Sequence, residues 1–310
     1  MTHIPTEVLP GTEASVPGST VAAASAPKAP ARRARADLLG LLPFTAYVLI
    51  FLGAPTVSVV FGAFQDDSGK PTFANITAIL HKPYAQAFAE SIEISLLTAV
   101  IGAVLGLLIA FAVTSSPADG VLRHVVSTAS GVLAYFGGVP LAFAFIATLG
   151  GEGLVTKGLA DIGVNVSGSY LFGFSGITLV YLYFQIPLMV LVIFPALEGI
   201  RPQWTEAARN LGASRLQYWR LVGGRLLFPP FLGALMLLFA NAFASYATAE
   251  ALTNGVIPLV PIQIGSVMSG NVAAGQENLG NALGFGMIVV VALAFLAYAW
   301  AQRRSARWMR

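Results

Sequence analysis

The sequence contains six long apolar segments, at about residues 38–64, 92–114, 121–149, 171–199, 227–252 and 281–301. An α-helix needs about 20 mostly apolar residues to cross the hydrocarbon core of a bilayer, and each segment is long enough to do so. Apolar residues follow one another without the alternation that marks the strands of a membrane β-barrel. The pattern therefore predicts an all-α membrane protein with six transmembrane helices.

The composition supports membrane insertion and argues against metal or thiol chemistry. Hydrophobic residues make up 56% of the 310 residues and charged residues 10%, whereas a soluble domain carries about 25% charged residues. The chain has no cysteine, which excludes disulfides, thiolate catalysis and cysteine metal sites. Its histidines, His3, His81 and His124, are too scattered to suggest a metal cluster. We therefore expect no metal and no cofactor.

The first 36 residues differ in composition from the rest of the chain. They are rich in Ala, Pro, Ser, Thr and Gly, and they end in a basic stretch that includes Lys28 and Arg35. Such a segment cannot bury enough apolar surface to offset the entropy of ordering it, so residues 1–36 are expected to be a disordered, solvated tail. The apolar run that follows is too long for the core of a cleavable signal peptide. Residues 37–310 then form the transmembrane domain.

The distribution of basic residues predicts the orientation of the chain. If the N-terminus is cytoplasmic and the chain crosses six times, 14 of the 17 Lys and Arg residues lie on cytoplasmic segments. The external loops hold only Lys70, Lys82 and Lys157. Such an excess of Lys and Arg is typical of the cytoplasmic side. Both termini are therefore expected in the cytoplasm, and the net charge of +3 needs no nucleic-acid partner.

Proline and glycine interrupt three of the predicted spans. The segment Gly137–Pro140 is expected to kink the third span, and the fourth contains Pro187 and Pro195. Pro229 and Pro230 fall in the first turn of the fifth span, where a missing N–H does little harm.

The cytoplasmic segment 201–225 is predicted to form two short helices joined by a tight turn. Pro202 suits the first position of a helix, and Gly212 can supply the left-handed residue that ends it. Ser214, followed three residues later by Gln217, forms a capping box that starts the second helix. This arrangement suits a docking element better than an enzyme site.

Both short helices have an apolar face. The faces consist of Trp204, Ala208 and Leu211 in the first helix and of Leu216, Trp219 and Val222 in the second. Ala207 and Ala208 keep one side of the first helix slim, so that the backbone of a partner could approach it.

The same segment resembles the EAA loop of permeases in binding-protein-dependent ATP-binding-cassette (ABC) importers. Glu206-Ala207-Ala208 is followed after three residues by Gly212, as in that family. The similarity continues through Arg209, Leu211, Ala213, Ser214 and Val222. The segment also precedes the penultimate span, which is its usual place. One position departs from the pattern, because Arg225 stands where the family usually has proline, although Pro229 matches a second family proline.

The resemblance implies a type I importer permease fold, with a core at about residues 90–300. It implies that cytoplasmic ATPase subunits dock on Glu206, Ala207, Ala208, Arg209, Leu211, Gly212, Ala213 and Ser214. The other implied partners are a second permease subunit, like or unlike, and an extracytoplasmic solute-binding protein, in addition to membrane lipid. The sequence has no Gly-x-x-x-x-Gly-Lys-Ser/Thr phosphate loop. ATP hydrolysis is therefore expected in a partner, and the chain is not expected to be an enzyme.

Ionisable groups at membrane depth are costly and usually functional. Glu250, near the outer end of the fifth predicted span, is the main one, and it follows a polar stripe that includes Ser245 and Thr248. The candidate residues for a solute path are Glu250, Tyr246, Asn241, Tyr135, Tyr183 and Gln185. The alternatives are a carboxylate at headgroup level for Glu250 and ordinary helix packing for the aromatic residues.

Four further charged residues are assigned structural roles. Glu90 and Glu93 are expected to begin the second span, since acidic residues favour a helix N-terminus. Lys157 and Asp161 are expected to lie on a short external helix.

The sequence leaves the class of solute open. The chain as a whole is similar to permeases for polyamines and related small charged solutes, including aminophosphonate, iron(III) and sulfate systems. Glu250 favours an amine-bearing cation such as putrescine or spermidine, but aromatic and amide groups would also suit a sugar. A secondary transporter should show inverted repeats or broken helices with ion-site carboxylates. An intramembrane enzyme should show a Ser/His, paired-Asp or metal constellation, and neither pattern is clear.

Overall fold

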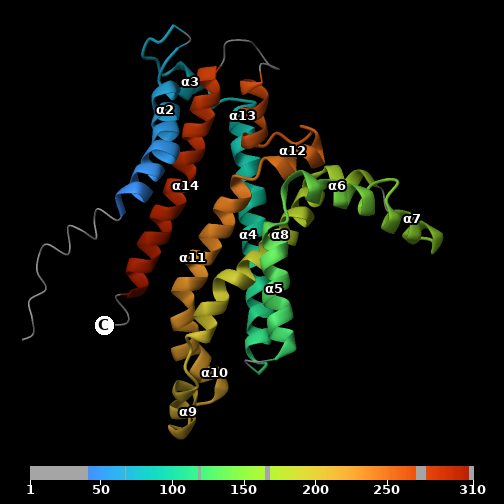
Figure 1. Ribbon diagram of the computed structural model, residues 1–310, viewed down its shortest axis with the longest axis vertical. Helices are drawn as coiled ribbons and strands as arrows, with labels where there is room; N and C mark the ends of the chain where they lie inside the picture. Colours follow the sequence, from blue (N-terminus) through green and yellow to red (C-terminus); the bar gives the residue numbers. More distant parts are fainter. Residues whose placement is uncertain (1–40, 67, 118–119, 165–167, 270–276, 307–310) are drawn as a thin grey trace, which may run out of the picture. The chain divides into compact units, whose positions relative to one another are not determined.

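A computed structural model describes residues 41–66, 68–117, 120–164, 168–269 and 277–306 (Figure 1). Regular structure in these ranges is helical, apart from one isolated antiparallel bridge between Gln65 and Pro71. The elements are a helix over residues 41–48, η1 (Leu49–Gly53), α2 (Ala54–Ala63), α3 (Ala74–Ala78), α4 (Tyr84–Thr114), α5 (Val121–Tyr135), α6 (Gly138–Leu149), α7 (Leu154–Asp161), η2 (Gly168–Phe172), α8 (Phe174–Glu198), α9 (Pro202–Asn210), α10 (Arg215–Tyr218), η3 (Trp219–Gly223), α11 (Gly224–Phe243), α12 (Ala247–Thr253), α13 (Val260–Met268) and α14 (Glu277–Ala306). The predicted tail, residues 1–36, lies outside the described residues.

The chain divides into two compact units, one ending at Ala54 and one beginning at Pro55. In the described part of the first unit, a helix over residues 41–48 continues into the π-helical turn η1. Large apolar side chains such as Phe44 and Phe51 are exposed on it. A helix that is apolar on all sides is expected inside a membrane or a large core.

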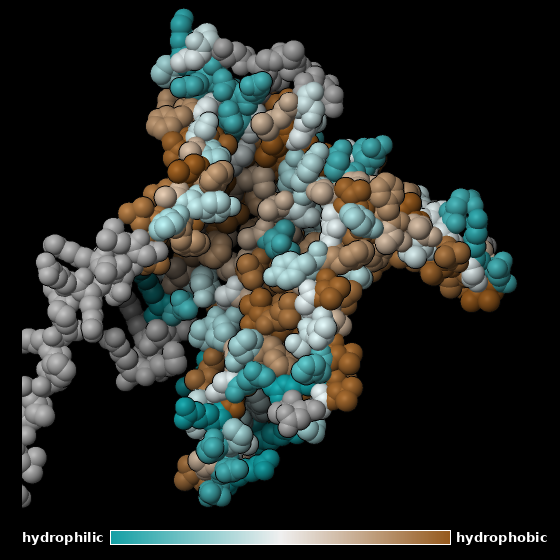
Figure 2. Space-filling model, viewed as in Figure 1, coloured by the Kyte–Doolittle hydropathy of each residue, from teal (hydrophilic) through white to brown (hydrophobic). Residues whose placement is uncertain are grey.

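Six segments of the described chain are long and apolar enough to cross a membrane. They are Leu41–Ala63, Tyr84–Thr114, Gly138–Asp161, Phe174–Glu198, Arg215–Phe243 and Glu277–Arg304. The expectation of an all-α protein with six membrane helices is therefore confirmed. On the face shown in Figure 2, hydrophilic residues gather at the end of the second unit where α9 and α10 lie.

The second span begins earlier than predicted, because α4 starts at Tyr84. Its added turns bury Ala87 and Ser91, and the Ser91 hydroxyl accepts a 2.9 Å hydrogen bond from the N–H of Val260 at the start of α13. Glu90 and Glu93 consequently lie inside α4 and not in its first turn. Their predicted role at the helix N-terminus is wrong, because a tertiary contact lengthens the helix beyond its apolar run.

The predicted third span is broken, not kinked. Helix α5 has 15 residues, or about 22 Å at 1.5 Å per residue, which is shorter than the hydrocarbon core of about 30 Å. The chain then turns at Gly137 and Gly138, with Gly138 at a φ of +72°, and continues as α6. Helix α5 packs on α8, whereas α6 packs on α12 (Figure 1). The left-handed backbone at Gly138 is accessible because glycine has no Cβ.

The predicted fifth span, 227–252, is also divided differently. Its helix starts at Arg215 and runs through α10, the π-helical turn η3 and α11, so that Pro229 and Pro230 lie inside it and not in its first turn. It ends at Phe243, and a separate helix, α12, begins at Ala247.

Helices α4 and α8 form the most closely packed pair of the core. A Cβ at Gly102 would lie 2.9 Å from the Cβ of Gln185, and one at Gly106 would lie 2.5 Å from the Cβ of Met189. Small residues allow helix backbones to approach closely inside membranes. The α11 side chains Leu238 and Phe243 complete the same buried cluster with Met189.

Candidate functional site

Helix α9 has the start and the end that the sequence predicts. Pro202 occupies the first turn, and Gly212 follows the helix with a φ of +77°. The N–H of Ala213 donates to the carbonyl of Ala208, and the N–H of Gly212 donates to the carbonyl of Arg209, both at 2.9 Å. These two bonds form a Schellman motif, which satisfies the last carbonyls of the helix.

A capping box connects α9 to the next helix. The Ser214 hydroxyl accepts from the N–H of Gln217 at 3.3 Å, and the Gln217 side-chain oxygen accepts from the N–H of Ser214 at 2.7 Å. The predicted second helix is short as α10, but it continues directly into η3 and α11. Residues 211–214 therefore join α9 to the helical run that begins with α10.

The surface of α9 and its turn exposes large apolar side chains. Leu211 is 87% exposed and Leu216 is 78% exposed, and Trp204 is also exposed. Glu206 and Ala207 are exposed beside them, and Glu206 forms no ion pair with any residue that the structure describes. Solvent-exposed apolar groups of this size, gathered around one short helix, are typical of a protein interaction site.

The end of α8 that precedes α9 is held to α5 by Arg123. The Arg123 guanidinium forms an ion pair with Glu198 and lies 5.1 Å from the ring centroid of Phe194. Both Glu198 and Phe194 belong to α8. This contact holds the end of α8, from which the chain continues into α9.

The candidate path residues of the fifth predicted span do not share one helix. Asn241 is on α11, Tyr246 is in the break and Glu250 is on α12. The predicted continuous polar stripe is therefore wrong, because the helix ends at Phe243. The buried Tyr181 hydroxyl stabilises the break by donating a 3.0 Å hydrogen bond to the carbonyl of Ser245.

Glu250 combines partial burial with an unpaired oxygen. Its Oε2 atom is buried and has no hydrogen-bond partner among the described residues. Leaving a buried polar atom unpaired in this way is costly. Tyr246 is partly exposed, and a Cβ at Gly265 of α13 would lie 2.9 Å from its ring.

The remaining candidates are separated from one another. Tyr135, at the end of α5, is 83% exposed, and Tyr183 is half-buried with its ring edge-to-face against Phe145 at 5.7 Å. Gln185 is fully buried, and its Nε2 donates a 3.1 Å hydrogen bond to the Thr98 hydroxyl of α4. Its Oε1 atom, like the Oε2 atom of Glu250, is buried and has no hydrogen-bond partner among the described residues.

Lys157 lies on α7, the short helix expected from the sequence, together with Asp161. Its ammonium group pairs at 2.8 Å with Glu152, which precedes the helix.

Three cavities were not anticipated from the sequence. A cavity of about 510 Å³ is lined by Gln86, Glu90, Glu93, Gly173, Phe174, Val256, Ile257 and Pro258. The Gln86 side chain donates a 2.8 Å hydrogen bond to Glu90. The spacing of 86, 90 and 93 places these side chains on one helix face, and this signal could have revealed the cavity. The other two cavities lie beside α10.

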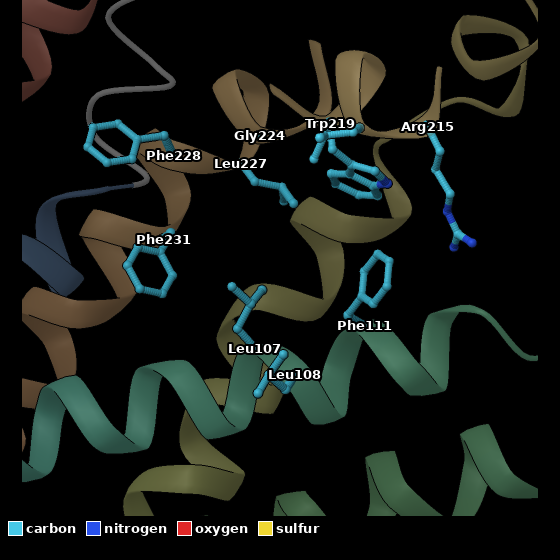
Figure 3. A pocket seen from close by; sticks show the side chains of 10 residues that line it. Leu107, Leu108, Phe111, Arg215, Trp219, Gly224, Leu227, Phe228 and Phe231 are labelled. Carbon is cyan, nitrogen blue, oxygen red and sulfur yellow. The ribbon is translucent and has the colours of Figure 1, made fainter. Parts of the chain in front are cut away.

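One of these two cavities is polar, and the other is apolar. The polar cavity, of about 360 Å³, is lined by Phe111, Thr114, Ser115, Leu197, Ile200, Thr205, Ala208, Arg209, Ala213, Ser214, Arg215, Tyr218 and Trp219. The apolar cavity, of about 810 Å³, is lined by Leu107, Leu108, Phe111, Arg215, Leu216, Trp219, Gly224, Leu227, Phe228 and Phe231 (Figure 3). None of the six candidate path residues lines either of them.

Known proteins share both the sequence pattern and the fold. The family described as binding-protein-dependent transport system inner membrane component matches residues 85–310. The protein named ferric transport system permease protein FbpB 1 of Haemophilus influenzae is 24% identical over 277 residues, which are 86% of this chain and 42% of that protein. The chain thus spans less than half the length of that relative.

Two further similarities cover more of the compared proteins. The spermidine/putrescine transport system permease protein PotB of Haemophilus influenzae is 22% identical over 261 residues, 82% of this chain and 89% of that protein. A chain from the crystal structure of a bacterial alginate ABC transporter, in complex with an alginate pentasaccharide-bound periplasmic protein, superposes with a TM-score of 0.71 at 18% identity. The superposition covers 88% of this chain and 96% of that chain.

The family is one of transport permeases and not of enzymes. The match covers most of the chain and includes α9, so the family suggested by Glu206 and Gly212 is confirmed. With its six apolar spans, the chain belongs to the binding-protein-dependent transport system inner membrane components and is a multi-pass protein of the bacterial inner membrane.

Proposed function

We propose that this chain is the permease subunit of an ABC importer and that α9 is its docking element for a cytoplasmic ATPase. The observation that carries the proposal is the exposed apolar surface around α9, where Leu211 is 87% exposed and Trp204 is also exposed. The ATPase would cover these side chains, and a basic group on it would pair with Glu206.

The arrangement of α9 also supports a mechanism of energy coupling. Residues 211–214 are fixed by the Schellman motif and by the capping box, so that α9 and α10 are joined by a short, defined turn. Closure of two ATPase subunits on ATP would move α9 as a rigid body. The continuous run α10–η3–α11 would carry that movement into the membrane.

The remaining partners belong to the same importer architecture. A second permease subunit, like or unlike, would form the other half of the solute pathway. A solute-binding protein outside the membrane would deliver the solute. The alginate transporter was crystallised in complex with a periplasmic protein that carries an alginate pentasaccharide, and the family is described as binding-protein-dependent; both support this proposal.

For the solute we favour a small cation such as a polyamine. Glu250 has an unpaired buried oxygen, and Glu90 and Glu93 line an open cavity at the end of α4 that is expected to be external. The relative named for spermidine and putrescine is consistent with this choice. A sugar or an anion is the second candidate, because Asn241 and Tyr246 are exposed near the break and the alginate transporter has the same fold.

The docking proposal is tested by co-purification of this chain with the ATPase subunits of its transporter. Leu211→Asp places a charge on the exposed apolar side chain of the turn, and we expect it to reduce the bound ATPase at least tenfold. Ile162→Asp is the matched control, since Ile162 is an apolar residue after α7 that is 73% exposed. Unchanged ATPase binding by Leu211→Asp would refute the docking surface.

A further inference from the structure

The apolar and polar cavities beside α10 share three lining residues, Phe111, Arg215 and Trp219. The rings of Phe111 and Trp219 pack edge-to-face, with their centroids 5.1 Å apart. Figure 3 shows Arg215 beside this ring pair at one end of the apolar cavity, with Phe228 and Phe231 at the other end. The two cavities therefore adjoin, with a cation at the junction.

The chemistry of the two cavities is different. Apart from Arg215, the larger cavity is lined by apolar side chains and glycine. The smaller cavity is lined by Arg209 and Arg215 and by the hydroxyl-bearing residues Thr114, Ser115, Thr205, Ser214 and Tyr218. The lining residues of the two cavities include no carboxylate. An anion with hydrogen-bond acceptors fits the polar cavity, and a hydrocarbon chain fits the apolar one.

The position of the cavities along the spans agrees with the depth of a lipid. Arg215 is the first residue of one candidate span, and Leu107 to Phe111 lie near the end of another. From Trp219 to Phe231 the helix rises by about 18 Å at 1.5 Å per residue, which is close to the roughly 15 Å of hydrocarbon in one leaflet. A phosphate at Arg215 would thus be at headgroup level, and an acyl chain would reach Phe231.

We propose that these adjoining cavities form a binding site for one anionic diacyl phospholipid, with its phosphate at Arg209 and Arg215 and an acyl chain along Trp219, Leu227 and Phe231. The charge complementarity and the depth favour a lipid over an apolar segment of a partner protein, which would leave the polar cavity and its arginines unmatched. Because α9 forms one wall of the polar cavity, the lipid would contact the docking element directly. The proposal depends on membrane insertion and not on the identity of the solute.

Trp219 provides a local probe of the site. We would use the full chain in nanodiscs, with Trp204, Trp300 and Trp308 replaced by Phe so that Trp219 remains as the single tryptophan. Fluorescence quenching by brominated phosphatidylglycerol is then compared with quenching by brominated phosphatidylcholine in a phosphatidylcholine bilayer. We expect about a fivefold preference for phosphatidylglycerol, the effect of roughly one basic residue at an anionic surface.

Variants identify the source of the preference. Arg215→Gln should remove most of it, Arg215→Lys should retain it, and Arg303→Gln, which changes an exposed arginine of α14 outside the site, should leave it unchanged. Equal quenching by the two lipids in the parent protein would overturn the proposal without any variant. Loss of the preference in excess inorganic phosphate would also overturn it, since it would indicate a site for a soluble anion.

Discussion

The backbone N–H of Gly138 donates a 2.8 Å hydrogen bond to the hydroxyl of Thr248, which is 110 residues away in the sequence. The bond joins the break between α5 and α6 to α12, the helix that follows the break after α11. Thr248 is 2% exposed. Two interrupted spans are therefore held together at a partly buried polar contact, in a region where unpaired backbone groups are costly.

Thr248→Val should destabilise the protein, because it preserves side-chain shape but leaves the Gly138 N–H unpaired. We expect a loss of about 1–3 kcal/mol in the free energy of unfolding. Reversible unfolding in mixed micelles measures the effect. Thr248→Ser keeps the hydroxyl and should lose much less. Thr178→Val is a second control, since the Thr178 hydroxyl is bonded only to the carbonyl of Phe174 in its own helix.

Structural features that depend on neighbouring residues could be predicted from the sequence, whereas features that depend on distant residues could not. Pro202, Gly212 and the pair Ser214 and Gln217 determine α9 and its turn through contacts within a few residues. Their structure was therefore predictable. The breaks at Gly138 and Ser245 depend on Thr248 and Tyr181, respectively, which lie far away in the sequence.

The orientation of side chains could not be predicted from the sequence either. Gln185 is a candidate residue of the solute path, and it is enclosed between α8 and α4 beside Thr98 and Gly102, so its place on the path remains a prediction. Membrane helices use polar residues both for packing and for transport, and composition does not distinguish these uses. The docking surface and the solute path remain predictions.

Gly212→Val should uncouple transport from the ATPase. The Gly212 φ of +77° is strained for a β-branched residue, and no atom lies within 4 Å of an added Cβ, so the effect is conformational. We expect uptake to fall at least tenfold with the protein still in the membrane. Gly212→Asn should be tolerated better, because Asn enters the left-handed region more easily. Gly69→Val is the matched control, as it imposes similar strain on an open loop position with a φ of +78°.

Glu206→Lys should abolish uptake by reversing the charge offered to the ATPase. The side chain is exposed and unpaired within the described chain, so the folded permease should lose little stability. Uptake and bound ATPase are both measured in membranes that contain equal amounts of permease. Gln203→Lys, on the same exposed helix, serves as the control. If Glu206→Lys transports normally with its ATPase bound, the role of Glu206 is refuted.

Arg123→Gln should weaken the contact between α5 and the end of α8, because it removes the ion pair with Glu198 and the contact with Phe194. Partly exposed pairs of this kind contribute about 0.2–1 kcal/mol, and the cation–π contact about 0.5–1 kcal/mol. A double-mutant cycle with Glu198→Gln, in which the free energy of unfolding is measured for each variant, gives the coupling energy between the two charges. If the two substitutions change the free energy of unfolding additively, the ion pair contributes nothing to the contact between α5 and α8.

Glu250→Gln should weaken the uptake of a cationic solute if Glu250 lines its path. A carboxylate in a low-dielectric vestibule raises the local concentration of cations and offsets part of their desolvation cost. We therefore expect the half-saturation concentration to rise about tenfold, while the amount of assembled complex stays unchanged. Uptake is measured over a range of putrescine or spermidine concentrations, in parallel with a neutral sugar. Glu152→Gln, which removes a carboxylate from an exposed position before α7, controls for the general loss of negative charge. An unchanged half-saturation concentration in Glu250→Gln would remove this residue from the path and would favour the sugar or anion alternative.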